Sequence, residues 1–453
     1  MVVLLFFVLA LPSLFLCILL KHRRNGSILL PPGPPGLPLI GHLHMQMLDN
    51  SAPHIFLWKL SQKYGPLMSL RFGFRPTLVV SSAKMAKEVM KTHDLDFCSR
   101  PTLHGSYKLS YKGLDLAFSP YTAYWREIRK ICVVHLFNSN RVQLYRPIRE
   151  DEVSRLIAKI SKLSVDSKPV NLSEAMMCLT STIICRVGFG KRYEDEGTER
   201  SRFHEMLNEA QALISGLLKR VEKNFKEFDT FYQKLIDEHL DPNRSKLEQE
   251  DIIDVLLQIW KDREFAVDLT IDHIKAVLMK VQEEVRSLIG KKDFVNEDDA
   301  HDLTYLKAVI KETFRFQPIA PLLVPRETMR KCSIGGNDIP AKTLVYVNAW
   351  AVGRDPEAWE NPKEFYPERF IGSSIDYKGL DFELIPFGAG RRGCPGIHMG
   401  VATVELALAN LLYKFDWEMP TGMNKEDLDF DVIPGITAHK KNALCLVVKE
   451  INV

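Results

Sequence analysis

Hydrophobic and polar positions are patterned differently in each part of this chain. Residues 2–20 form an apolar run of nineteen residues, interrupted only by Pro12 and Ser13 and followed at once by the basic segment 21–24. A helix of that length spans a hydrocarbon core of ~30 Å. Because the positive charges follow the run, the pattern predicts a membrane anchor over residues 1–21 with the rest of the chain in the cytosol. A cleaved signal peptide is the alternative, but no initial charge or clear small-residue cleavage site supports it.

The next segment, residues 22–38, is basic and then rich in proline. Residues 31–38 read Pro-Pro-Gly-Pro-Pro-Gly-Leu-Pro, a proline density that favours a stiff, extended conformation. We predict a hinge here, which sets the height and tilt of the following domain over the bilayer. No further linker divides residues 39–453, which are expected to form a single domain.

Periodicity within residues 39–453 predicts a mainly α-helical domain with small β-sheets. Helical spacing of apolar residues dominates residues 140–290, whereas strand-like runs gather on the N-terminal side. The fold class is therefore α+β, with an α-rich part and a smaller β-rich part. Strands are expected at Ser69–Phe72, Thr77–Val80 and Thr343–Asn348, and further helices at Ala83–His93, Tyr305–Arg315 and Met399–Leu412.

Composition and charge narrow the function classes. A 46% hydrophobic and 26% charged content is that of a globular protein and excludes wholesale disorder. The net charge of +3 and the absence of a basic run interleaved with aromatics give no indication of nucleic-acid binding. The eight cysteines include no C-x-x-C pair, which argues against zinc and iron–sulfur sites. Free thiols in a reducing compartment are expected.

The segment Phe387–Gly396 carries the candidate chemistry. It places Cys394 in a loop with four glycines, with Arg392 two residues before the cysteine and an apolar helical run after it. A cysteine thiolate is an axial ligand of haem iron and favours O–O cleavage. Glycines let the backbone pass close beneath a flat macrocycle, and a following helix N-terminus keeps the sulfur ionised. A buried cysteine in an ordinary glycine turn is the alternative.

The pattern F-x-x-G-x-R-x-C-x-G resembles the haem-binding loop of the cytochrome P450 family, the haem-thiolate monooxygenases. The resemblance implies the cytochrome P450 fold, an α-rich domain that encloses haem b (iron protoporphyrin IX). It makes Cys394 the axial ligand of the haem iron. The other loop residues that it assigns to haem binding are Phe387, Gly388, Gly390, Arg392 and Gly396.

Two further segments are similar to haem contacts of the family. Trp125 and Arg129 stand four residues apart and therefore share one helical face. In the family, this W-x-x-x-R pair binds a haem propionate through charge-assisted hydrogen bonds, although an exposed amphipathic helix produces the same spacing by chance. Arg326 is the third residue that the resemblance places at a propionate.

Glu312 and Arg315 match the E-x-x-R motif of the family, and Arg369 lies in the P-E-R-F segment that meets it. The resemblance implies a structural clamp beneath the haem loop. If this network is buried, removal of one member costs ~3–5 kcal/mol. A surface ion pair that contributes little is the alternative.

The substrate pocket of the family is lined by an apolar segment after E-x-x-R and by a turn near the C-terminus. The matching residues here are Ala320, Leu322, Val324 and Ile436.

The oxygen-activating segment of the family is missing from the sequence. In the family, a long central helix crosses the distal face of the haem and carries an acidic residue followed by threonine. Here a run that ends at Met279 resembles the first turns of that helix and passes directly into a segment from Lys280 that resembles the next helix. No catalytic residue can therefore be assigned. A second, shorter gap is expected near 216/217. A skipped exon, a faulty gene model and a pseudogene are all compatible with the pattern.

The resemblance implies a monooxygenase that inserts one atom of dioxygen into a small apolar plant secondary metabolite. Electrons would come from NADPH through NADPH–cytochrome P450 reductase, with cytochrome b5 as a second donor. Arg126 and Lys130 are expected to face solvent where such an acidic protein docks, and an ordinary solvated charge is the alternative for either residue. The implied protein is a monomer, anchored by one span in the endoplasmic reticulum membrane with its domain in the cytosol.

Two alternatives to an active enzyme follow from the missing segment. One is a chain that binds haem but is catalytically impaired, and the other is a chain too incomplete to fold and retain haem.

Overall fold

The computed structural model describes residues 29–49, 51–103, 107, 112–165, 168–192, 292–420, 432–433, 439–440 and 443–451. The predicted anchor, the two predicted gaps and Ile436 lie outside the described residues. Among the residues that are described, no helix is both long and apolar enough to cross a membrane.

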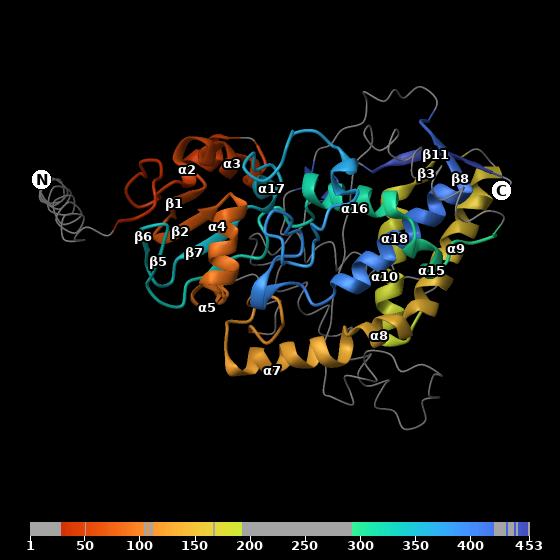
Figure 1. Cartoon of the computed structure of the whole chain (residues 1–453), viewed down its shortest axis with the longest axis horizontal. Coiled ribbons are helices and arrows are strands. Elements are labelled where there is room, and N and C mark those ends of the chain that lie inside the picture. The colour runs from red at the N-terminus through yellow and green to blue at the C-terminus, as the bar shows by residue number, and fades with distance from the viewer. Residues whose placement is uncertain are drawn as a thin grey trace, which may run out of the picture.

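The described chain has a β-rich end, which the N-terminus enters, and an α-rich end (Figure 1). The main sheet has the strand order β1-β2-β7-β4. The central strand β2 pairs antiparallel to β1 and parallel to β7, so two segments far apart in sequence share one core. The bounds are β1 Leu67–Phe72, β2 Arg75–Val80, β4 Arg326–Glu327 and β7 Leu344–Val347. The predicted strands are confirmed to within two residues.

Short helices cover the sheet. They are α2 Leu43–Leu48, α3 Pro53–Tyr64, α4 Ala83–Lys87, α5 Asp94–Phe97 and α17 Ala349–Val352, with a π-helical turn η1 at Glu88–Thr92. The hairpin β5 Cys332–Ile334 and β6 Asn337–Ile339 lies at the same end. The predicted helix at Ala83–His93 is therefore divided, because its second half continues as the π-helical turn.

The α-rich end contains the remaining described α-helices, including the three longest, α9, α10 and α18. The helices at this end are α7 Ala123–Ile131, α8 Ser139–Leu144, α9 Arg146–Val165, α10 Leu172–Phe189, α15 Glu297–His301, α16 Thr304–Phe316 and α18 Ile397–Lys414. Another π-helical turn, η2 Cys132–Leu136, follows α7. A three-stranded sheet, in the order β3-β11-β8, closes this end with β3 Val170–Asn171, β8 Phe415–Glu418 and β11 Cys445–Glu450. Residues 432–433 and 439–440 form the pair β9–β10.

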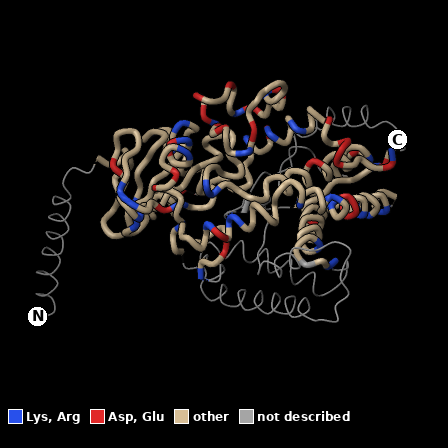
Figure 2. Tube along the Cα trace, turned by 60° about the horizontal axis from the view of Figure 1, so that its bottom comes forward, with Lys and Arg blue, Asp and Glu red and all other residues tan. Residues whose placement is uncertain are grey.

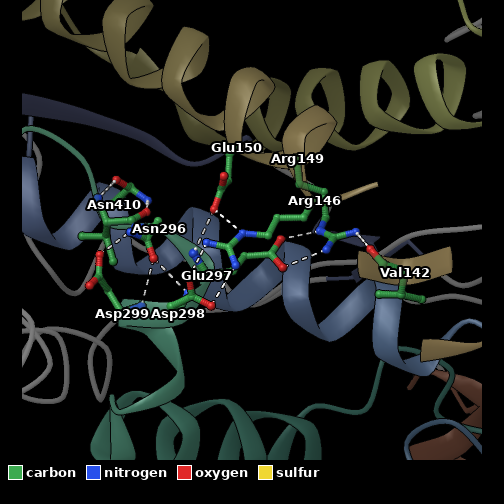
Figure 3. A network of polar contacts seen from close by, with 10 residues as sticks. Val142, Arg146, Arg149, Glu150, Asn296, Glu297, Asp298, Asp299 and Asn410 are labelled. Atoms are coloured by element: carbon green, nitrogen blue, oxygen red, sulfur yellow. Dashed lines mark hydrogen bonds and ion pairs between the residues drawn. The ribbon is translucent and has the colours of Figure 1, made fainter. Parts of the chain in front are cut away.

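A polar network fastens α9 to α15 (Figure 3). Arg149 is fully buried and binds both carboxylate oxygens of Glu297, at 2.5 and 2.8 Å, while Arg146 binds both oxygens of Asp298 at 2.7 Å. Asn410 of α18 bonds both the N–H and the carbonyl of Val295. The segment from residue 292 to α15 is therefore fixed against α9 and against α18.

The proline-rich segment lies against the sheet. The N–H of Ser69 in β1 donates to the carbonyl of Pro32 at 2.8 Å, and His42 Nε2 donates to the carbonyl of Pro34 at 2.8 Å. A side chain at Gly33 would lie 1.9 Å from the Ser69 carbonyl oxygen, so only glycine allows this approach. The described part of the predicted hinge is thus fastened to the domain.

Basic and acidic residues are interspersed over most of the described chain (Figure 2), but residues 29–87 contain six Lys and Arg and a single acidic residue, Asp49. No disulfide joins any of the seven cysteines among the described residues.

Candidate functional site

The cysteine loop forms the turn that leads into α18. The N–H of Cys394 donates to the carbonyl of Phe387 at 2.9 Å, and the N–H of Gly393 donates to the carbonyl of Gly390 at 3.0 Å. The thiol of Cys394 is exposed, and it stands two residues before Gly396, the N-cap of α18. The positive end of a helix dipole therefore lies beside the sulfur, which favours the thiolate.

Two glycines of the loop are needed for its backbone. Gly388 and Gly390 both have φ of +68°, a conformation that other residues adopt only at a cost. A side chain at Gly390 would also lie 2.2 Å from the carbonyl oxygen of Met90 in η1. This close approach positions the loop directly on the β-rich end of the molecule.

The buried carboxylate of Asp94 holds the loop to α5. It accepts bonds from the backbone N–H of Arg391 at 3.1 Å and from its guanidinium at 2.9 Å. Its other oxygen pairs with Arg326 at 3.1 Å, and Arg326 also donates to the carbonyl of Ala389 at 2.8 Å. Arg326 thus lies against the cysteine loop, and its expected role at a haem propionate stays a prediction. The motif of the cysteine loop does not include Asp94, because this residue comes from a helix 300 residues before Cys394.

Arg392 is buried, and one of its donors has no partner. Its Nε donates to the carbonyl of Cys98 at 2.7 Å and its Nη2 to that of Ser119 at 2.8 Å, whereas Nη1 has no hydrogen-bond partner among the described residues. Burial, together with repulsion from Arg326 and Arg129, lowers the pKa of Arg392 to about 9. A buried guanidinium with a free donor is costly unless an anion meets it.

Trp125 supports Arg392 instead of offering its own donor. Its indole N–H donates to the carbonyl of Leu116 at 2.9 Å, and the Arg392 guanidinium lies 3.8 Å from the centre of its ring. The expectation that this N–H faces a propionate therefore differs from the structure, because a buried indole takes the nearest carbonyl. Arg129 does lie near the loop. Burial lowers its pKa, and the neighbouring Cys394 sulfur opposes that shift.

Arg100 belongs to the same group of buried arginines as Arg392 and Arg326, although no sequence motif marks it as a haem ligand. It donates to the carbonyls of Ala117, Val324 and Pro325, and burial and the charges of Arg392 and Arg326 lower its pKa strongly. Its signal in the sequence is weak, since one arginine in a loop has no periodic partner.

These buried guanidiniums have few nearby anions to offset them. Asp94 is engaged by Arg326 and Arg391, and burial raises the pKa of Asp115 to about 6. A flat cofactor with two carboxylates and a thiolate-bound metal would satisfy both the excess positive charge and the free donor of Arg392. The residues present therefore fit haem.

The E-x-x-R motif forms a buried network. Glu312 and Arg315 are each 0% exposed and share two hydrogen bonds of 2.6 and 2.7 Å. Arg369 reaches the same carboxylate at 3.2 Å, and the N–H of Tyr366 donates to it at 2.7 Å. Phe387 connects this network to the loop by edge contact with Phe314 on α16.

The proposed pocket segment lies between the sheet and the loop. Leu322 packs against the core under β1 and β2, and the carbonyl of Val324 accepts from Arg100. Ala320 is partly buried and accepts a hydrogen bond from Leu323. Leu323 has φ of +52°. Its Cδ1 atom lies 3.9 Å from the position that a Cβ atom would take at Gly388. Leu323, which belongs to the predicted apolar segment but was not one of the residues selected from it, therefore lies close to the loop.

With this geometry established, comparisons identify the family. The family model described as Cytochrome P450 matches residues 31–281 and 275–447. The chain is 48% identical to 6,7,8-trihydroxycoumarin synthase of Pastinaca sativa over 99% of both chains, and 44% identical to Cytochrome P450 71A1 of Persea americana over 98% of both. A zebra fish cytochrome P450 structure with progesterone superposes with a TM-score of 0.75 at 26% identity, covering 89% of this chain and all of the other.

The chain therefore belongs to the cytochrome P450 family of monooxygenases, and its mainly helical fold with small sheets is that of the family. Both of these sequence relatives are plant proteins.

The relatives contain residues that this chain lacks. The alignment with the Pastinaca sativa enzyme runs over 498 positions but uses 99% of a 453-residue chain, so about 50 positions have no residue here. The two parts of the family match meet at residues 275–281, where Met279 is followed by Lys280.

Proposed function

We propose that this protein is a haem-thiolate monooxygenase that hydroxylates a small, flat, apolar metabolite of the coumarin class. The observation that carries the proposal is the exposed Cys394 thiol beside a group of buried arginines with an unpaired donor. The substrate class is supported by the names of relatives, which include 6,7,8-trihydroxycoumarin synthase and 5-OH-xanthotoxin synthase of Pastinaca sativa.

In this proposal Cys394 ligates the iron of haem b. Arg392, through its free Nη1, and Arg129 hold the propionates, and Arg100 and Arg326 add positive charge behind them. When bound, haem supplies the oxygen chemistry. The protein supplies ligation, orientation and exclusion of water, and the Glu312–Arg315–Arg369 clamp holds the segment 353–369, which precedes the loop.

An electron donor has a suitable surface on α7. Arg126 and Lys130 are exposed on this helix, one turn apart, and Lys130 pairs only loosely with Glu127, at 3.7 Å with both side chains 70% exposed. We infer that an acidic NADPH–cytochrome P450 reductase, with cytochrome b5 as second donor, docks here. The apolar run 2–20 anchors the monomeric protein in the endoplasmic reticulum membrane with the domain in the cytosol.

A second candidate is a haem-binding protein with impaired turnover. The observation that favours it is the absence from the sequence of the acid–threonine pair, together with the roughly 50 alignment positions that have no residue here. Such a chain would consume NADPH without a matching yield of product, because protons would not be delivered in order.

Spectroscopy of the full chain tests haem ligation. We expect the red-shifted Soret band of a haem-thiolate protein in the reduced carbon monoxide complex, and its loss in Cys394→Ser. Cys445→Ser, which changes the cysteine at the start of β11, is the matched control. An unaltered spectrum in Cys394→Ser would overturn the assignment.

Turnover separates the two candidates. With reductase, NADPH and xanthotoxin or a dihydroxycoumarin as probes, the enzyme forms a hydroxylated product in proportion to the NADPH used. NADPH loss without product would favour the impaired protein.

A further inference from the structure

A short turn before α7, residues 115–119, accepts hydrogen bonds from three buried side chains of the candidate site. The pairs are Trp125 Nε1 with the carbonyl of Leu116 at 2.9 Å, Arg100 Nε with that of Ala117 at 2.9 Å and Arg392 Nη2 with that of Ser119 at 2.8 Å. Because the three donor side chains are buried, each depends on a protein acceptor. The conformation of the turn therefore sets where Arg100 and Arg392 lie.

The carboxylate of Asp115 holds this turn from within. The N–H of Phe118 donates to it at 2.9 Å, and the N–H groups of Ala117 and Ser119 also donate to it. Successive N–H groups that converge on one anion form a nest, in which the anion fixes the conformation of the backbone that supplies them. Asp115 thus orders the peptide units of the turn.

The planarity of those peptide units connects Asp115 to the buried donors. In a trans peptide the N–H and the carbonyl of one unit point in opposite directions. The N–H groups of Ala117 and Phe118 point to Asp115, so the carbonyls of the same two units, those of Leu116 and Ala117, point away from it. These are the carbonyls that accept from Trp125 and Arg100.

The charge of Asp115 also acts on the arginines. Burial lowers the pKa of Arg100 and of Arg392, and the Asp115 charge opposes that shift. The hydrogen bonds that the carboxylate accepts, however, come from the backbone of the turn. This contact pattern favours a role in geometry over a role as a counter-charge.

We propose that Asp115 is a positioning residue of the haem site, which orders the turn 115–119 so that Arg100 and Arg392 present their free donors to the carboxylates of the cofactor. Arg392 depends on the turn most directly. Its Nε binds the carbonyl of Cys98 and its Nη2 that of Ser119, and Nη1 has no partner among the described residues. Because the guanidinium is planar, its two bound nitrogens fix the direction of the third. The inference rests on the haem binding proposed above.

Variants of the haem-loaded full chain separate geometry from charge. Asp115→Asn keeps an acceptor of the same length without a charge, whereas Asp115→Glu keeps the charge but moves it one methylene further from the turn. Asp115→Ala removes both. Asp355→Ala is the matched control, since Asp355 is a buried aspartate that also accepts backbone bonds, from the N–H of Ala83 at 3.0 Å and of Glu357 at 3.1 Å.

Two measurements report on the cofactor. The rate of haem transfer to an excess of apomyoglobin measures how firmly haem is held, and the propionate bending band in the resonance Raman spectrum reports the hydrogen bonds of the propionates. We expect haem loss to be about 10- to 100-fold faster in Asp115→Ala and Asp115→Glu, as is typical when a group that orients a direct ligand is removed, and the propionate band to shift. Asp115→Asn should resemble the parent in both, and Asp355→Ala should leave the band unchanged.

The comparison of asparagine with glutamate decides the inference even when Asp115→Ala does not fold by circular dichroism. Fast haem loss in Asp115→Asn with parent-like loss in Asp115→Glu would mean that the charge matters and not the geometry, which overturns the inference. Parent-like haem loss in both Asp115→Ala and Asp115→Glu, or an equal shift of the propionate band in Asp355→Ala, also overturns it and leaves the proposed haem binding intact. A parent chain without the red-shifted Soret band overturns both.

Discussion

At the scale of residues, the site depends on unequal numbers of buried positive and negative groups. Arg392, Arg326 and Arg100 are buried close together, and Asp94 is the buried carboxylate that pairs with Arg326 and Arg391. Desolvation acts on each guanidinium, which explains why the pKa of Arg392 falls to about 9. An anion bound here would offset the desolvation cost of the guanidiniums. The excess positive charge therefore favours the binding of an anionic cofactor.

Asp115, beside Arg100, gives a pH-dependent prediction. Burial raises its pKa from 3.8 to about 6, although Phe118 N–H donates to its carboxylate at 2.9 Å. A carboxyl with a higher pKa in the folded state stabilises the fold at low pH, and this contribution is lost as the pH rises from about 4 to about 6. The free energy of unfolding should therefore fall across that range by up to ~3 kcal/mol on account of this group.

Urea denaturation of the Asp115→Asn variant at a series of pH values tests this. The asparagine keeps an acceptor for Phe118 N–H but does not titrate, so the variant should lack this part of the pH dependence. Asp302→Asn, at a side chain 81% exposed, serves as the control and should keep it. Parallel pH curves for the parent and Asp115→Asn would contradict the prediction.

At the scale of elements, α7 and α16 show the same sequence spacing with opposite consequences. Glu127–Lys130 on α7 and Glu312–Arg315 on α16 are both separated by three residues, but the first pair is 70% exposed on each side and the second is fully buried. Only the buried pair has further partners, which come from the segment 353–369. Packing, and not the spacing, decides which pair matters for stability.

Matched substitutions measure this difference. Glu312→Gln should lower the free energy of unfolding by ~3–5 kcal/mol, because it leaves Arg315 buried without a counter-charge. Glu127→Gln should lower it by less than ~1 kcal/mol, because water replaces an exposed partner. Chemical denaturation of both variants gives the comparison, and similar losses would show that the clamp is not a stabilising unit.

At the scale of the whole molecule, contacts between distant parts of the sequence build each end and join one end to the other. The loop before α18 contacts η1, α15 is bonded to α9, and β2 pairs with β7. The described residues thus build the part of the site that surrounds Cys394. The roughly 50 positions that the Pastinaca sativa relative has in addition would add burial to a fold whose net stability is usually only ~5–15 kcal/mol.

Restoring those positions tests their role. Insertion of the corresponding segment of 6,7,8-trihydroxycoumarin synthase between Met279 and Lys280 should increase haem retention and the yield of product per NADPH consumed. A glycine–serine insert of equal length is the control and should change neither. An unchanged yield after insertion of the native segment would contradict the role expected for these positions.

The sequence by itself determined the helices and strands near the site and the identity of the thiol. The periodicity of hydrophobic residues and the turn residues that bound each element are local properties of the sequence. The positions of α16, α18, β1 and β2 were therefore predicted to within a few residues. Motif spacing likewise marked Cys394, Glu312 and Arg315, because these residues act as fixed units within one turn or one loop. The same reasoning left Asp94, Arg100 and Leu323 undetected, since none has a periodic or motif partner.

The tertiary structure alone decided which charges are buried and which donors stay free. Trp125 and Arg129 share a helical face in the sequence, but the indole binds Leu116 and the free donor belongs to Arg392, from a segment more than 260 residues later. Burial and partner choice depend on segments that meet only after folding, and no local pattern encodes them.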